Sequence, residues 1–136
     1  MKIVKFLLPE KFRGFLRRVI KKIRYAYRCW IILLASRSER PMNIILGAAE
    51  TAQKGWYSTN EQWLNITKEG DWKRIFRGES LLWRVVAEHV FEHLSAEEAG
   101  LALKYVYQHM RSGGKIRIAV PDGYHPNREY LLHVGI

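Results

Sequence analysis

The sequence predicts an α/β fold in which a doubly wound, mostly parallel sheet follows a basic amphipathic helix. Along residues 41–136, short apolar runs that suit buried strands alternate with segments of helical periodicity. The charge excess lies before them: residues 1–40 hold 12 Lys/Arg and 2 Asp/Glu, and residues 41–136 hold 11 of each sign. We therefore divide the chain into a basic helical arm with its linker, residues 1–40, and an α/β domain, residues 41–136.

The arm has the periodicity of one long helix that begins near Pro9-Glu10. Its apolar residues recur every three or four positions and form one stripe: Phe12, Leu16, Val19, Ile23, Tyr27, Trp30 and Leu34. Most of its basic residues fall off that stripe. The segment 36–41 is polar and ends in proline, which indicates a linker into the domain.

Three interpretations of the arm stay open. The helix can pack its stripe on the domain and leave its arginines in solvent. It can instead lie on an anionic membrane surface through residues 10–35, or contact the phosphates of a nucleic acid. Nucleic acid is the weakest of the three, because no recognised nucleic-acid motif accompanies the charge.

The composition excludes several other classes. With one cysteine, Cys29, the chain has no internal disulfide and no multi-cysteine zinc site. Residues 29–35 are apolar but too short for the roughly 18–20 residues of a membrane span. We expect a cytoplasmic protein, peripheral to a membrane if the arm binds one.

The domain has about five strand candidates, at residues 42–47, 55–60, 63–67, 81–87 and 115–120. A short helix is predicted at 71–76. A longer one starts at the capping box Ser95-Ala96-Glu97-Glu98, includes Met110 and stops at Gly113-Gly114. The expected sheet is Rossmann-like with strand order 3-2-1-4-5. Its carboxyl ends bring Gly47, Asn60, Glu88 and Asp122 to one edge, where such sheets bind ligands.

The stretch A-E-H-V-F-E-H-L at 87–94 also matches the H-x-x-E-H pattern of inverted zinc peptidases. That pattern needs His89 and His93 on one helical face and a third ligand elsewhere. Because a strand ends at Ala87 and a helix cap follows at Ser95, we expect a loop or a single turn here, and no metal site. His93 is expected to pack against the following helix.

Residues 42–130 resemble class I S-adenosylmethionine-dependent methyltransferases, specifically the small type 11 bacterial group. Three segments carry the resemblance: L-G-A-A-E-T-A-Q-K-G-W-Y-S-T-N at 46–60, A-E-H-V-F-E-H-L at 87–94, and S-G-G-K-I-R-I-A-V-P-D-G-Y-H-P at 112–126. The resemblance implies S-adenosyl-L-methionine as cofactor and a small-molecule or saccharide-type methyl acceptor. The basic arm lies outside it.

The resemblance also implies roles residue by residue. The loop after the first strand wraps the methionine moiety of the cofactor through Gly47, Ala48, Ala49 and Thr51. Asn60 binds the ribose hydroxyls, and Asn65, Ile66 and Thr67 border the adenine. Glu88 and His89 line the pocket, and His89 is the candidate base in methyl transfer.

The chain departs from the family pattern in three ways. Ala48 and Ala49 replace loop glycines, and Asn60 stands where an acid is usual. The adjacent Glu61 is expected to point to the other face by strand alternation. The family fold has seven strands, so a chain that stops soon after its fifth is expected to be truncated, with an open fifth-strand edge that a partner could cover. The alternative function is a non-catalytic remnant that acts as a binding or membrane-surface module.

Overall fold

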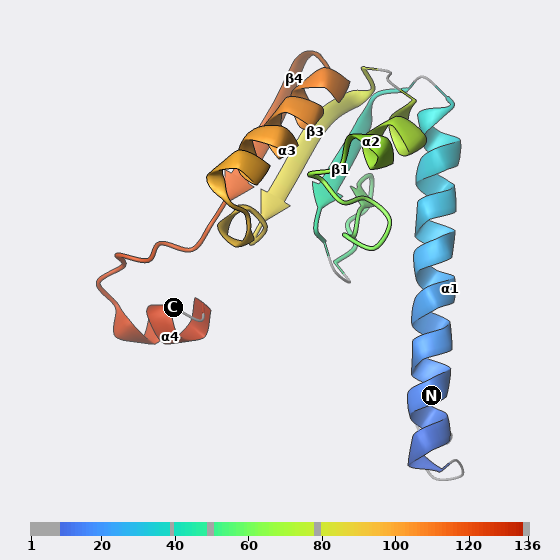
Figure 1. Cartoon of the computed structure of the whole chain (residues 1–136), viewed down its shortest axis with the longest axis vertical. Helices are drawn as coiled ribbons and strands as arrows, with labels where there is room; N and C mark the ends of the chain where they lie inside the picture. The colour runs from blue at the N-terminus through green and yellow to red at the C-terminus, as the bar shows by residue number, and fades with distance from the viewer. Residues whose placement is uncertain (1–8, 39, 49–50, 78–79, 135–136) are drawn as a thin grey trace.

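The computed structural model describes residues 9–38, 40–48, 51–77 and 80–134, and it has an α/β fold (Figure 1). Its elements are α1 (Glu10–Ser36), β1 (Met42–Leu46), β2 (Tyr57–Ser58), α2 (Glu69–Phe76), β3 (Leu82–Glu88), the 3₁₀ turn η2 (Phe91–His93), α3 (Ala96–His109), β4 (Met110–Ala119) and α4 (Arg128–Val134).

Within the described residues, the sheet has four parallel strands in the order β2-β1-β3-β4. The predicted count of five and the order 3-2-1-4-5 are therefore wrong. The missing strand is the segment 63–67, which forms turns before α2 instead of pairing with β2. The apolar residues of this segment are nevertheless buried, so its apolar pattern correctly predicted burial but wrongly predicted a strand.

Two helices, α2 and α3, lie on the same face of the sheet (Figure 1). They meet around His109, whose ring centroid lies 5.2 Å from that of Trp72 and 5.8 Å from that of Phe76. Beneath them the core collects the apolar residues of β1 and β3, including Ile44, Leu46, Leu82, Val85 and Ala87.

Neither α2 nor α3 covers the opposite face of the sheet, so these two described helices do not by themselves form a doubly wound arrangement. The cross-strand neighbours Arg84 and Lys115 lie there, both exposed, and Arg117 forms an ion pair with Glu88. Charged side chains at alternate strand positions tolerate water, which explains why this face needs no helix to cover it.

The helix α1 contacts β2, which forms one edge of the sheet. The N-terminal half of α1 projects beyond the rest of the domain (Figure 1). The helix packs through Tyr25, Ile32 and Ser36, which are buried. The stripe identified in the sequence faces solvent: Val19 is half-buried, and the other members are exposed. The interpretation that α1 packs this stripe on the domain is therefore wrong.

The connection from α3 to β4 is tighter than the sequence predicted. The helix ends at His109, and Met110, expected in the helix, is the first residue of the strand. The strand register shifts between Leu82 and Arg84, so that Arg111 to Gly114 bulge out of the ladder. A Cβ at Gly114 would lie 2.9 Å from the Arg111 carbonyl oxygen and 3.0 Å from that of Leu82, so only glycine fits this bulge.

Candidate functional site

A cavity of about 570 Å³ lies at the carboxyl ends of β1, β2 and β3. We call it the strand-end cavity. Six residues singled out in the sequence line it: Gly47, Asn60, Asn65, Ile66, Thr67 and His89. They come from three separate segments that the parallel sheet brings to one edge. Its volume is within the roughly 300–1,000 Å³ typical of small-molecule sites.

The other described residues that the resemblance assigned to the cofactor lie outside the cavity lining. Ala48 is buried and donates its amide to Thr59 O at 2.9 Å, while Thr51 O accepts a hydrogen bond from Ser58 Oγ at 2.6 Å. Both contacts tie the loop after β1 to β2. Glu88 is not among the residues that line the cavity, and its carboxylate pairs with Arg117 instead. Ala49 lies outside the described residues.

Gly47 brings two loops of the cavity into contact. It has a φ of +60°, and a Cβ added to it would lie 2.7 Å from Val90 Cγ2. The sequence predicted close approach of this loop to a cofactor. The structure shows close approach to the loop after β3, so glycine here fixes how the two strand ends fit together.

The turn after β2 places a carboxylate in the cavity. Asn60 Oδ1 accepts a hydrogen bond from the Gln62 amide at 2.9 Å, and the amides of Trp63 and Leu64 bond to Asn60 O. Because β2 ends at Ser58, strand alternation does not extend to Glu61, and the expectation that it points to the other face is wrong. Glu61 lines the cavity beside Asn60.

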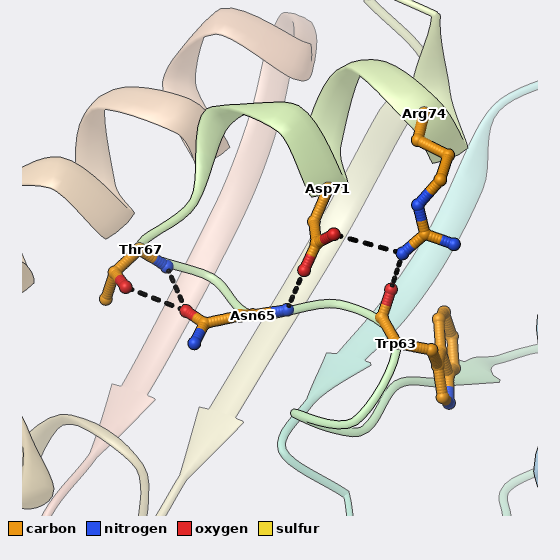
Figure 2. Close-up of polar contacts among 5 residues, drawn as sticks. All are labelled: Trp63, Asn65, Thr67, Asp71 and Arg74. Carbon is orange, nitrogen blue, oxygen red and sulfur yellow. Dashed lines mark hydrogen bonds and ion pairs between the residues drawn. The ribbon is translucent and has the colours of Figure 1, made fainter.

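The cavity wall formed by residues 63–67 is held by α2 (Figure 2). Asn65 N donates to Asp71 Oδ2 at 2.8 Å, and Trp72 Nε1 donates to Ile66 O at 3.0 Å. Arg74 Nη2 bonds both to Asp71 Oδ1, at 3.1 Å, and to the carbonyl oxygen of Trp63. Within the wall, Asn65 Oδ1 accepts from the amide and hydroxyl of Thr67, at 3.0 and 2.7 Å.

Asp71 stays ionised because of these contacts. Burial raises the pKa of its carboxyl, but the hydrogen bond from Asn65 N, together with the hydrogen bond and charge of Arg74, outweighs burial. The net pKa is below the ordinary value. A charged Asp71 is thus part of what positions Asn65 at the cavity.

His89 stands at the end of β3 with a φ of +54°, a left-handed conformation that is uncommon outside glycine. Its amide donates to Ala119 O at 3.0 Å, which holds the strained residue to β4. Its side chain is 64% exposed, and Nδ1 lies 3.2 Å from Glu92 Oε1. A carboxylate at Nδ1 orients the ring and leaves Nε2 as the nitrogen that can accept a proton.

The zinc-peptidase geometry is not formed. Phe91–His93 is a single 3₁₀ turn and His89 lies outside any helix, so the two histidines do not share a helical face. Over the described ranges, no group of three or more His, Cys, Asp or Glu side chains could hold a metal ion. His93 is exposed and lines the cavity.

The N-terminus of α3 adds a second carboxylate to the cavity. The capping box is formed as predicted: Glu98 N donates to Ser95 Oγ at 3.2 Å, and Ser95 N donates to Glu98 Oε2 at 2.9 Å. The bond from the Ser95 amide, followed by the Ser95 side chain, lowers the pKa of Glu98 below its ordinary value. Glu98 therefore combines a structural cap with a negative charge at the cavity.

The helix α1 forms part of the cavity wall through Lys21 and Tyr25. The Lys21 Nζ lies 5.5 Å from the centre of the Tyr25 ring, one helical turn along. The sequence placed these residues in a separate arm, and nothing local marks them as cavity residues. In the structure, Tyr25 is the one aromatic residue of α1 that is buried against the domain, and this burial places Lys21 and Tyr25 at the cavity.

The strand-end cavity therefore offers amides, hydroxyls, two carboxylates, an ammonium group and two imidazoles around an apolar wall that includes Leu64, Ile66 and Leu94. This set suits a small polar molecule that also carries a flat apolar part. Comparisons of the chain with protein-family models, with curated proteins and with solved structures found no match.

Proposed function

We propose that the strand-end cavity binds S-adenosyl-L-methionine and that the protein transfers its methyl group to a small-molecule acceptor. The observation that carries the proposal is the meeting of Gly47, Asn60, the 65–67 wall and His89 around one cavity. The resemblance implies that these same residues bind one cofactor. We propose, with it, that the four-stranded sheet is a reduced Rossmann-like sheet.

The groups at the cavity fit this cofactor. Glu61 supplies a charged acceptor for the ribose hydroxyls. Asn60 offers only a neutral amide, and its Oδ1 already accepts a hydrogen bond from the Gln62 amide. Lys21 is the cationic partner for the cofactor carboxylate. Leu64 and Ile66 form the apolar surface for the adenine.

When bound, S-adenosyl-L-methionine supplies a methyl group on a sulfonium that is already activated for transfer. The protein's own task is to position the acceptor and remove its proton. His89 takes that proton at Nε2, while Glu92 holds Nδ1 and stabilises the imidazolium that forms. The exposed side chain of His89 places this base where an acceptor can reach it from solvent.

Titration calorimetry with S-adenosyl-L-methionine and its demethylated product tests the binding step. We expect saturable binding, with NAD as a nucleotide control that binds more weakly. Glu61→Gln is expected to lower the affinity about tenfold, because a neutral amide replaces a charged acceptor at the ribose. No binding at millimolar cofactor contradicts the proposal.

Glu97→Gln is the matched control, since Glu97 is an exposed glutamate on α3 that is not among the cavity residues. Its affinity should equal that of the unchanged protein. If Glu97→Gln weakens binding as much as Glu61→Gln does, the effect is one of overall charge and the assignment of Glu61 fails.

A binding module without catalysis is the second candidate. The ion pair between Glu88 and Arg117 favours this candidate. Glu88 does not line the cavity, so β3 supplies no carboxylate that could act on a methyl acceptor there. His89→Asn separates the two candidates, because asparagine tolerates the left-handed backbone but cannot act as a base. In an enzyme it lowers turnover about 10²–10⁴-fold with cofactor affinity unchanged. If the protein is a binding module, neither the unchanged protein nor His89→Asn shows methyl transfer.

A further inference from the structure

The exposed side of α1 is apolar along most of its length. It carries Phe12, Phe15, Leu16, Ile20, Ile23, Tyr27, Trp30 and Leu34, all exposed. At 3.6 residues per turn these side chains gather on one side of the helix, away from Tyr25 and Ile32, which pack on the domain. We call this set the apolar face of α1. It can meet a partner without α1 leaving the domain.

The charge of α1 indicates what that partner is. The helix holds eight Lys/Arg and one acid, Glu10. On the helical projection, Lys11, Arg18 and Lys22 border one side of the apolar face, and Arg17 and Arg24 border the other. An apolar centre with basic borders and exposed aromatic rings is the pattern of helices that lie in the interface of an anionic bilayer.

A second copy of the chain fits this face less well. Two such helices packed face to face would bring basic borders against basic borders, and like charges at the flanks of a helix pair disfavour association. A spanning helix is also not indicated, since none of the described helices is long and apolar enough to cross a membrane.

We propose that α1 docks the protein on an anionic lipid surface through its apolar face, with the helix axis in the plane of the interface. Phe15 and Ile23, which are 56% and 64% exposed, enter the acyl boundary. The bordering lysines and arginines contact lipid phosphates, each strengthening binding about fivefold. This docking requires no ligand in the strand-end cavity, so it stands apart from the proposed methyl transfer.

Co-sedimentation of the full chain with vesicles tests the proposal, using phosphatidylglycerol-rich vesicles and pure phosphatidylcholine vesicles without cofactor. We expect binding to the first at low salt, a loss of at least tenfold in affinity on the second, and weakening as salt rises. Trp30, on the apolar face, should shift its emission to the blue on binding, and Trp30→Phe should abolish that shift.

Two matched pairs of variants sharpen the test. Phe15→Ser with Ile23→Ser should reduce vesicle affinity at least tenfold. Tyr107→Ser with Leu132→Ser should leave it unchanged, although Tyr107 and Leu132 are 81% and 70% exposed on α3 and α4. Arg18→Gln with Lys22→Gln should reduce the preference for anionic lipid more than Lys54→Gln with Lys68→Gln.

Three results would overturn the proposal. The first is no binding to either vesicle. The second is equal loss of binding in both serine pairs. The third is a dimer in sedimentation velocity that dissociates in Phe15→Ser with Ile23→Ser while vesicle binding is absent, which would assign the face to a second copy. Circular dichroism of each variant should match the unchanged protein.

Discussion

Gly47 determines how the loops after β1 and β3 fit together, because it combines a left-handed backbone with a site that Val90 already fills. Two separate costs follow for any other residue here. One is the conformational cost of a Cβ at positive φ, and the other is the collision with Val90.

Gly47→Ala should lower the free energy of unfolding by about 2–3 kcal/mol. Gly55→Ala is the control, because Gly55 also has a positive φ but no described atom lies within 4 Å of its added Cβ. It should cost only about 1 kcal/mol. Denaturant unfolding of both variants, and of Gly47→Ala combined with Val90→Ala, measures the two costs separately. Equal costs at Gly47 and Gly55 would show that the contact with Val90 is unimportant.

Glu61 shows where reasoning at single positions succeeds and fails. Gly47 and Asn60 were predicted to lie at this edge from their places after apolar runs, because parallel strands deliver their ends to one edge. The same argument named Glu88 and Asp122, which do not line the cavity, and His89 was predicted from the resemblance alone. Glu61 was misplaced because alternation was extended past the end of β2 at Ser58. A turn reverses that alternation, and the Asn60 side chain that caps the turn was the available signal.

At the scale of elements, α2 and the wall 63–67 behave as one unit joined by Asp71 and Arg74 (Figure 2). The pKa of Asp71 is lower in the folded protein than its ordinary value near 4. The stability it contributes is therefore fully present above pH of about 4 and is lost as the pH falls through the lower, folded pKa.

Asp71→Asn should lower the free energy of unfolding by about 1–2 kcal/mol at neutral pH. Asparagine has a single side-chain oxygen, so it can accept the hydrogen bond from Asn65 N or the one from Arg74 but not both. The difference from the unchanged protein should shrink as the pH falls below about 4. Urea unfolding between neutral pH and pH 3 measures it, with Glu97→Gln as a control. A difference that does not depend on pH would mean that the charge of Asp71 contributes nothing.

The elements that the sequence predicted best are those with a local signal. The cap at Ser95, the β1 run and the long helix at the N-terminus are all present as expected. The segment 63–67 was assigned wrongly because burial against α2 and edge pairing with β2 leave the same apolar pattern. For α1, periodicity located a stripe but could not tell which side meets the domain, because Tyr25 and Ile32 supply a second apolar side.

At the scale of the whole molecule, the sheet has two unlike edges (Figure 1). Beside β2 lies α1, whereas β4 forms the other edge of the sheet. The exposed Arg111, Lys115 and Arg117 of β4 discourage pairing with another strand. A partner that covers this edge stays a prediction from the sequence, as does a cytoplasmic location.

The helix α1 carries residues of both the strand-end cavity and the apolar face. Lys21 and Tyr25 line the strand-end cavity, while Ile23 and Tyr27, two residues further along from each, belong to the apolar face. Given both proposals, α1 contributes residues to both binding sites, so a ligand that favours one position of α1 changes the affinity of the other site.

Such coupling is reciprocal by necessity. If anionic vesicles change the affinity for S-adenosyl-L-methionine by some factor, the cofactor must change the affinity for vesicles by the same factor. Calorimetry with and without vesicles, paired with vesicle titrations with and without cofactor, measures both sides. Lys21→Ala should reduce the two factors together. Through α1, the anionic lipid surface then acts as an allosteric effector of the strand-end cavity.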